Sequence, residues 1–123
     1  MKIRIKGNSI RYRLTKTEIA NFGKNGYLEE RTEFANGASF RYRLERKTGA
    51  EELEAAFSDN TITLTVPEKI ADEWIATEVV GYNNTVPIDE GKELFLLIEK
   101  DFVCLDHTFE DQSDNYDNPN KTC

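Results

Sequence analysis

Length, composition and charge set the first limits on this protein. The chain has 123 residues, of which 38% are hydrophobic, which is enough for one domain with a modest core. No stretch approaches the roughly 20 apolar residues of a membrane helix, and the alternating first residues do not resemble a signal peptide. We therefore expect a cytoplasmic protein without membrane contact. The net charge of −7 argues against general nucleic-acid binding.

The charge is unevenly distributed along the chain. Residues 1–50 hold 12 of the 16 basic and 5 of the 23 acidic residues, and residues 51–123 hold the rest. Either the two halves neutralise each other within one domain, or the first half forms a local basic site for an anionic ligand. The two cysteines, Cys104 and Cys123, follow no export signal, which favours reduced thiols.

The first half predicts two strands, a short helix and two more strands. Alternating side chains indicate the strands, Gly7-Asn8 suits a tight hairpin turn, and Thr15 begins the helix. The predicted elements, in chain order, are strands 2–6 and 9–14, a helix at 15–23, and strands 27–34 and 38–46.

The second half repeats this order. Asn8-Ser9-Ile10 recurs as Asn60-Thr61-Ile62, and each of these strands leads into a helix. The predicted elements are strands 51–57 and 60–66, a helix at 67–76, and strands 79–86 and 93–100. We interpret the pattern as an internal duplication, with repeat 1 at about residues 1–48 and repeat 2 at about residues 51–100.

Eight strands without long crossovers predict an antiparallel sheet, and a sheet of this size tends to curl and close. We therefore expect an α+β fold that is mainly antiparallel β. Its duplicated ββαββ unit would form an eight-stranded barrel-like sheet with two short helices. This single domain would span residues 1–103, followed by an acidic C-terminal tail at 104–123.

Charged residues alternate with apolar ones along several strands, so they share one face of the sheet. They would face solvent, the commoner arrangement in antiparallel sheets, or line an internal tunnel as a basic cradle. The candidate ligand-binding residues are Lys2, Arg4, Lys6, Arg11, Arg13, Glu29, Arg31, Glu33, Arg41 and Arg43.

The duplicated strand–helix–strand order over residues 1–100 resembles the CYTH-like, or triphosphate tunnel, superfamily. The resemblance implies an eight-stranded barrel around a charged channel that binds triphosphate and divalent metal. The family's Glu-x-Glu-x-Lys signature corresponds to Lys2-Ile3-Arg4-Ile5-Lys6, in which only Lys6 matches, so the resemblance implies anion binding more than catalysis. The opening MKIRIKGNSIRYRLTKTE also resembles that of a small uncharacterised bacterial family.

The tail contains the weak candidates for a metal site. Cys104 and His107 are three residues apart, a spacing that zinc sites use, and Asp106 and Cys123 would complete the ligand set. A surface contact is the commoner role for a lone histidine beside a carboxylate. Phe109 and Tyr116 would anchor the tail across an open end of the barrel.

Three functions follow from these patterns. The first is a non-enzymatic protein that binds a phosphate-bearing or other anionic small molecule. The second is a degenerate metal-dependent triphosphate phosphohydrolase in which Glu52 and Glu54 bind Mg²⁺. The third is an interaction module whose charged face binds a protein partner or a second copy of the chain. The sequence leaves any cofactor unknown, and it has no phosphate-binding Gly-rich loop or Gly-x-Ser-x-Gly motif.

Overall fold

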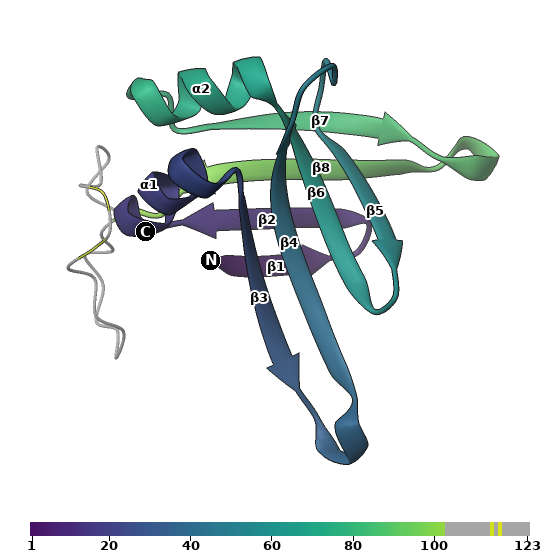
Figure 1. The fold of residues 1–123 in the computed structure, drawn as a ribbon. Helices are drawn as coiled ribbons and strands as arrows, with labels where there is room; N and C mark the ends of the chain where they lie inside the picture. Colours follow the sequence, from purple (N-terminus) through teal and green to yellow (C-terminus); the bar gives the residue numbers. More distant parts are fainter. Residues whose placement is uncertain (103–113, 115, 117–123) are drawn as a thin grey trace.

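The structure is a computed structural model that describes residues 1–102, 114 and 116. The described residues form eight strands, two α-helices and two single-turn 3-10 helices, in the predicted order (Figure 1). The largest difference is that the fifth strand begins at Glu54 rather than at residue 51. The elements are β1 Lys2–Lys6, β2 Ser9–Leu14, α1 Lys16–Asn25, β3 Tyr27–Glu33, η1 Ala35–Gly37, β4 Ser39–Lys47, β5 Glu54–Ser58, β6 Thr61–Pro67, α2 Glu68–Ala76, β7 Gly81–Pro87, η2 Asp89–Gly91 and β8 Glu93–Lys100.

The strands form two separate sheets, and the prediction of one closed antiparallel barrel is wrong. Sheet A has the strand order β1-β2-β8-β7, and sheet B has the order β3-β4-β6-β5. Both sheets are mixed, because β2 pairs with β8 and β4 with β6 in parallel, whereas the hairpins are antiparallel. Each helix carries the chain from one sheet to the other. The two sheets cross and cover each other's apolar faces, so the core is buried without barrel closure (Figure 1).

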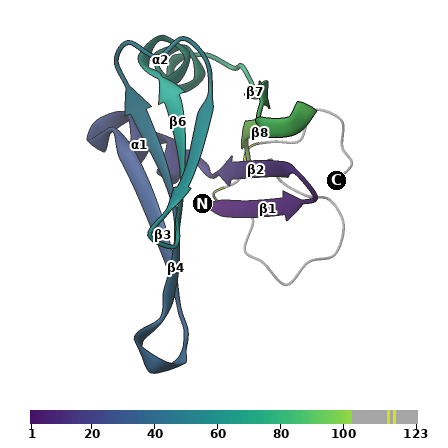
Figure 2. The ribbon, with the colours of Figure 1, turned by 90° about the vertical axis from the view of Figure 1, so that its right-hand side faces the viewer.

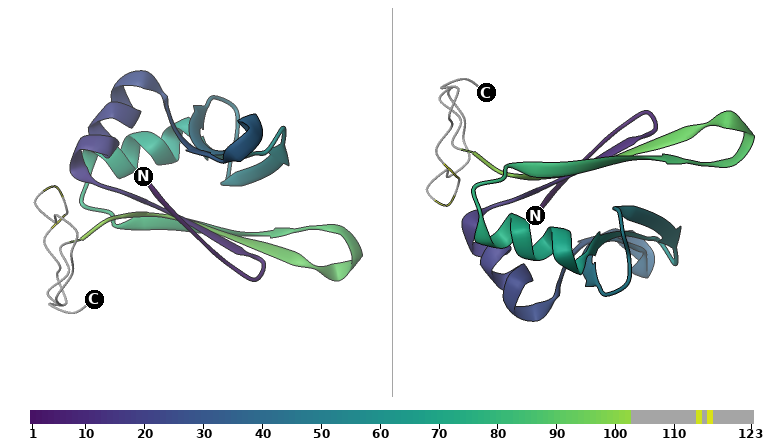
Figure 3. Two further views of the ribbon diagram at one scale, coloured as in Figure 1. Left: turned by 90° about the horizontal axis from the view of Figure 1, so that it is seen from below. Right: turned by 90° about the horizontal axis from the view of Figure 1, so that it is seen from above.

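The two helices lie side by side at one end of the sheets (Figure 3). The Thr15 side chain accepts a hydrogen bond from the backbone N–H of Glu18, whose side chain accepts one from the Thr15 N–H. This capping box defines the start of α1. Phe22 of α1 and Trp74 of α2 meet edge to face, with ring centroids 6.3 Å apart. The helices thereby cover one end of the space between the sheets.

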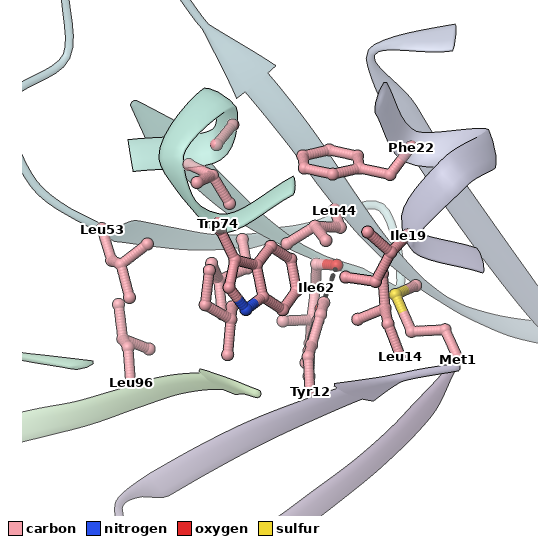
Figure 4. Close-up of a cluster of buried hydrophobic side chains, with 14 residues drawn as sticks. Met1, Tyr12, Leu14, Ile19, Phe22, Leu44, Leu53, Ile62, Trp74 and Leu96 are labelled. Atoms are coloured by element: carbon pink, nitrogen blue, oxygen red, sulfur yellow. Dashed lines mark hydrogen bonds between the residues drawn. The ribbon is translucent and has the colours of Figure 1, made fainter. Parts of the chain in front are cut away.

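The core contains side chains from both sheets and both helices (Figure 4). Tyr12 is fully buried and donates a hydrogen bond from its hydroxyl to the carbonyl of Ile62 at 3.0 Å, which ties sheet A to sheet B. Burial of one large apolar side chain contributes about 1.5–3 kcal/mol. The buried hydrophobic residues are Met1, Tyr12, Leu14, Ile19, Phe22, Leu44, Leu53, Ile62, Leu64, Val66, Ala71, Trp74, Leu96 and Ile98.

Corresponding parts of the two halves occupy corresponding places. The order β1-β2-α1-β3-β4 is followed by β5-β6-α2-β7-β8, and each sheet combines one hairpin from each half. Matching backbone hydrogen bonds join the hairpins. The N–H of Phe95 donates to the carbonyl of Asn8, and the N–H of Arg41 donates to that of Asn60, both at 3.0 Å. Each sheet is therefore completed by a segment from the other half.

Candidate functional site

The ten candidate residues lie on two different sheets. In each sheet they alternate with buried residues such as Tyr12 and Leu44, so they occupy the side turned away from the core. We call these outward sides face A and face B, after their sheets, and Figure 2 shows the two sheets as separate layers. Face A carries Lys2, Arg4, Lys6, Arg11 and Arg13, and face B carries Glu29, Arg31, Glu33, Arg41 and Arg43.

Face A brings like charges directly opposite one another. In the antiparallel β1–β2 pair, Lys2 lies opposite Arg13 and Arg4 lies opposite Arg11. Like charges in these positions destabilise a strand pair. Face A carries five basic side chains but only two acidic ones, Glu93 and Glu99. Both glutamates are on this face because alternate residues of β8 share the same side of the sheet.

Glu99 neutralises part of face A. Its carboxylate accepts a hydrogen bond from Nε of Arg13 and lies 3.7 Å from Nε of Arg11. No ion pair of Arg4 or Lys6 occurs within residues 1–102 or with residues 114 and 116. Lys2 is also paired, because its Nζ lies 3.1 Å from the carboxylate of Asp101. The basic charge that remains is therefore that of Arg4 and Lys6 on β1, at the outer edge of the sheet.

The other half of face A is less charged. In the register of the sheet, Arg11 is next to Leu97 of β8, and Leu97 is next to Asn83 of β7. Phe95 and Leu97 are half-buried although they point away from the core. Face A thus combines a basic half on β1–β2 with an apolar and polar half on β8–β7.

On face B, Arg43 is paired with acidic side chains. Glu29 lies opposite Arg43 in the β3–β4 register, and the two charged groups are 3.6 Å apart. Arg43 also donates from Nε to Glu45, and its guanidinium lies 4.2 Å from the centre of the Tyr27 ring. This arrangement combines ion pairs with a cation–π contact, so the Arg43 charge is already satisfied.

The remaining two arginines of face B, Arg31 and Arg41, lie directly opposite one another in the β3–β4 register, and each also has a contact of its own. Arg31 lies 3.9 Å from Glu33, and Arg41 donates from Nη2 to the carbonyl of Asp59 at 3.5 Å. Alternate residues of the four strands place four basic and four acidic side chains on this face, so their charges balance. Glu29 and Glu33 therefore partner arginines of face B, not the basic residues of face A.

Sequence reasoning missed Glu99 as a member of the site. Alternation alone assigned Glu99 a face but not its neighbours, which depend on the parallel pairing of β2 with β8. The matching order of elements in the two halves offered a signal, because Glu45 and Glu99 occupy corresponding positions in β4 and β8. Glu99 is paired with arginines of the neighbouring strand β2, whereas Glu45 is paired with Arg43 of its own strand.

The end of β8 contacts both the residue that follows α2 and the described part of the tail. Lys100 is buried and donates from Nζ to the carbonyl of Thr77 at 2.7 Å, and burial lowers the pKa of Lys100. The Tyr116 ring packs edge to face on Phe102, with centroids 5.7 Å apart. Asp114 accepts a hydrogen bond from the Thr17 hydroxyl, so the tail contacts the start of α1. The expected second anchor, Phe109, lies outside the described residues.

The metal-site candidates of the tail also lie outside the described residues, namely Cys104, Asp106, His107 and Cys123. Within residues 1–102, 114 and 116, no three His, Cys, Asp or Glu side chains are grouped as metal ligands would be. Of the two acids considered for Mg²⁺, Glu54 lies on face B opposite Thr65. It is therefore not on the sheet that carries the basic residues of face A.

An apolar groove opens between the two sheets beside the β1–β2 turn. Its volume is about 260 Å³. Ile5 of β1 and Phe57 of β5 flank it with 55% and 66% of their surface exposed. Its floor is formed by residues of β2, β5, β6 and β8, among them Ile10, Ala55, Ile62 and Leu94. The groove is therefore a sizeable apolar surface close to the basic strand β1.

Comparisons with known proteins bear on the family of this chain. No helix in the described residues has the length and apolar character needed to cross a membrane. No curated protein and no solved structure matches the chain. The model of a family of unknown function, DUF7009, matches residues 1–120. The chain therefore belongs to the DUF7009 family.

Proposed function

We propose that the protein is a non-enzymatic interaction module whose face A binds an acidic surface of a partner protein. The observation that carries this proposal is the excess of basic side chains on face A, five against two acidic ones, whereas the charges of face B balance. Within this excess Arg4 lies opposite Arg11 across β1–β2, and like charges directly opposite one another destabilise a strand pair. Acidic side chains of a partner would relieve the repulsion, and charge complementarity of this kind favours specific association.

A small phosphate-bearing molecule, the ligand expected first, has less support. Arg11 and Arg41 were expected in one cradle, but they belong to different sheets whose charged faces turn away from one another. Face A is an open sheet surface rather than a tunnel. An extended acidic surface contacts more of its five basic side chains at once than a single phosphate group does.

The phosphohydrolase alternative has the weakest support. Protein-bound Mg²⁺ usually combines carboxylates with substrate phosphates, so acids and phosphate-binding bases must share one site. Glu54 and the bases of face A are on different sheets. The charged residues of face A form no acid pair around which a metal ion and a triphosphate would assemble.

The test compares an acidic polypeptide with a small anion. Poly-L-glutamate and tripolyphosphate are titrated separately into the full chain by isothermal calorimetry at low and at physiological salt. We expect poly-L-glutamate to bind, and to bind more weakly as salt screens the charges. Arg11→Glu should weaken binding by about tenfold or more, or about 1.4 kcal/mol.

Arg31→Glu is the matched control, since it makes the same charge change on face B, where half of the Arg31 side chain is exposed. It should leave binding of poly-L-glutamate nearly unchanged. Stoichiometric binding of tripolyphosphate without binding of poly-L-glutamate would overturn the proposal in favour of the small ligand. Equal losses in the two variants would show that net charge, rather than face A, attracts the polymer.

We also propose that the two halves arose by duplication. The matching order of elements and the matching hairpin hydrogen bonds support this origin. The tips of the β3–β4 and β7–β8 hairpins add a further correspondence, because Asn36 and Glu90 both have positive φ, 64° and 60°. Each is followed by a glycine that also has positive φ, so the two tips share an unusual backbone path.

A relation to CYTH-like proteins is supported by the order of the elements alone, since the strands form two open sheets. A bacterial, cytoplasmic location remains part of the proposal. Its support is the small number of cysteines, which suits a reducing compartment.

A further inference from the structure

We infer that the acidic partner binds as an extended segment that adds a strand to β1, with its apolar side chains in the groove between Ile5 and Phe57. This inference rests on the proposed function, because it specifies the form in which an acidic partner engages face A. Strand addition to an open sheet edge combines backbone hydrogen bonds, which give affinity, with pockets for alternate side chains, which give specificity.

The geometry of β1 suits strand addition. β1 is a terminal strand of sheet A, so one row of its backbone N–H and C=O groups is not used by β2. The strand is largely exposed. Figures 1 and 2 show that sheet B continues past this edge, so a strand added beside β1 would lie over the inner side of sheet B.

The groove supplies the apolar half of the site. An added strand would turn every second side chain inward, on the same side as Ile3 and Ile5. Ile5 of β1 and Phe57 of β5 line the groove together with Ile62 and Leu94. The large exposed fractions of Ile5 and Phe57 are costly for a surface with no occupant, and contiguous exposed apolar side chains commonly mark binding sites.

Charge determines which kind of segment fits. The outward side chains of an added strand would lie beside Arg4 and Lys6, so acidic residues are favoured at these alternate positions. The matching segment therefore alternates acidic and apolar residues. A second copy of β1 is disfavoured as the occupant, because its own basic residues would face those of the first copy.

The edge strand β5 lacks the basic side chains that give β1 this selectivity. The outward residues of β5 are Glu54, Ala56 and Ser58, which present no basic side chain to an acidic neighbour. Basic residues on an exposed edge also oppose indiscriminate strand pairing. β1 thus rejects most strands and accepts acidic ones.

The test uses a fluorescein-labelled heptapeptide, Glu-Val-Glu-Ile-Glu-Val-Glu, with blocked ends. Fluorescence anisotropy measures its binding to the full chain. Three control peptides separate the contributions: lysine in place of every glutamate, the same residues with all glutamates grouped at one end, and the alternating peptide with N-methylated valine and isoleucine. We expect each control to bind at least about tenfold more weakly, or by about 1.4 kcal/mol.

Variants of the chain identify the site. Ile5→Asp should reduce binding of the alternating peptide by about tenfold or more, because it puts an acidic group at the groove mouth. Ile88→Asp is the matched control, because Ile88 is an isoleucine with 42% exposure in the β7–β8 connection. The double variant Arg4→Glu, Lys6→Glu should reverse the preference, so that the lysine peptide binds better than the glutamate peptide.

The outcomes separate this inference from the proposed function. Strand addition would be wrong if the grouped peptide bound as well as the alternating one and Ile5→Asp had no effect. If Arg11→Glu still abolished binding in that case, the proposal that face A binds an acidic surface would be retained. Loss of binding in Ile5→Asp but not in Arg11→Glu would overturn face A as the docking surface. Slower amide exchange along β1 on peptide binding would support the added strand directly.

Discussion

Face A and face B are built in the same way and differ in how their charges are paired. Both are the outward sides of four-stranded sheets made from two hairpins joined by a parallel strand pair. On face B, Glu29 lies opposite Arg43. On face A, Arg4 lies opposite Arg11, and the nearest acid, Glu99, comes from a different hairpin.

The comparison teaches that the fold does not require an excess of basic side chains on a sheet face. Face B demonstrates that the same architecture accommodates arginines with acidic partners within the protein. The charges of face A therefore go beyond what the architecture needs, which is the pattern expected where stability is given up for a function. Core substitutions in the two sheets should therefore destabilise the protein by similar amounts, whereas charge substitutions on the two outward faces should have different effects.

The largest expected effect tests the equality of the cores. Leu44 of β4 and Ile98 of β8 occupy corresponding positions, and both are fully buried. Leu44→Ala and Ile98→Ala should each lower the free energy of unfolding by about 2–5 kcal/mol, because each leaves a cavity in the shared core. Urea denaturation measures both. A variant that costs much less than its counterpart would mean that the two sheets do not share one core.

A smaller effect is expected when face A is given the charge pattern of face B. Arg4→Glu puts an acid opposite Arg11, as Glu29 is opposite Arg43. We expect the free energy of unfolding to rise by about 0.2–1 kcal/mol, while binding to poly-L-glutamate weakens. Thermal denaturation and calorimetry on the same preparation measure the two changes. Arg4→Thr is the control, because it removes the repulsion between residue 4 and Arg11 without adding an attractive charge.

The two corresponding glutamates provide a finer comparison. Glu99→Gln should destabilise the protein by up to about 1 kcal/mol, and Glu45→Gln by less than about 0.5 kcal/mol. The reason is that Arg43 keeps Glu29 and the Tyr27 ring when Glu45 is neutralised. Glu99→Gln should also strengthen binding of acidic peptides, whereas Glu45→Gln should not. The opposite ranking in urea denaturation would contradict the assignment of the charges.

The smallest effect concerns a hydrogen bond between a strand and a helix, which the second half of the chain has and the first half lacks. The Tyr82 hydroxyl of β7 donates to Glu73 of α2 at 2.6 Å, whereas Leu28, at the corresponding place in β3, has no hydroxyl. Burial, together with Glu73, raises the pKa of Tyr82 to about 12. An unfolded tyrosine titrates near 10.

Since the folded-state pKa is the higher one, the stability from this contact is fully present below about pH 10 and is lost as pH rises through about 12. Tyr82→Phe should therefore be less stable than the wild type below pH 10, and the difference should shrink between pH 10 and 12. Denaturation curves at pH 8 and above measure this convergence. Parallel curves across the whole range would mean that the hydroxyl is not titrating with folding.

Several features of the fold follow from local patterns. That Arg11 and Arg13 share one side of their strand follows from their alternation with Tyr12 and Leu14, and the strand bounds of β1 and β2 match the predicted ones. The helix start at Thr15 follows from its capping box. These features depend on residues close together in the chain, so the sequence contains the information that specifies them.

The ten candidate residues were expected in one group, and the structure divides them between two sheets. Expecting one antiparallel sheet brought Arg11 and Arg41 together, whereas the parallel pairs β2–β8 and β4–β6 assign them to different faces. The groove beside Ile5 also escaped prediction, because Phe57 and Leu94 reach it from other strands.

By itself, the sequence determined the order of the strands and helices and the side of each strand that is charged. Both are consequences of period-two and period-3.6 patterns within short segments. Only the tertiary structure decided which strands are neighbours, and hence that β1 ends as an open basic edge beside an apolar groove. Strand pairing depends on how apolar faces from distant segments bury one another, and no local pattern encodes that choice.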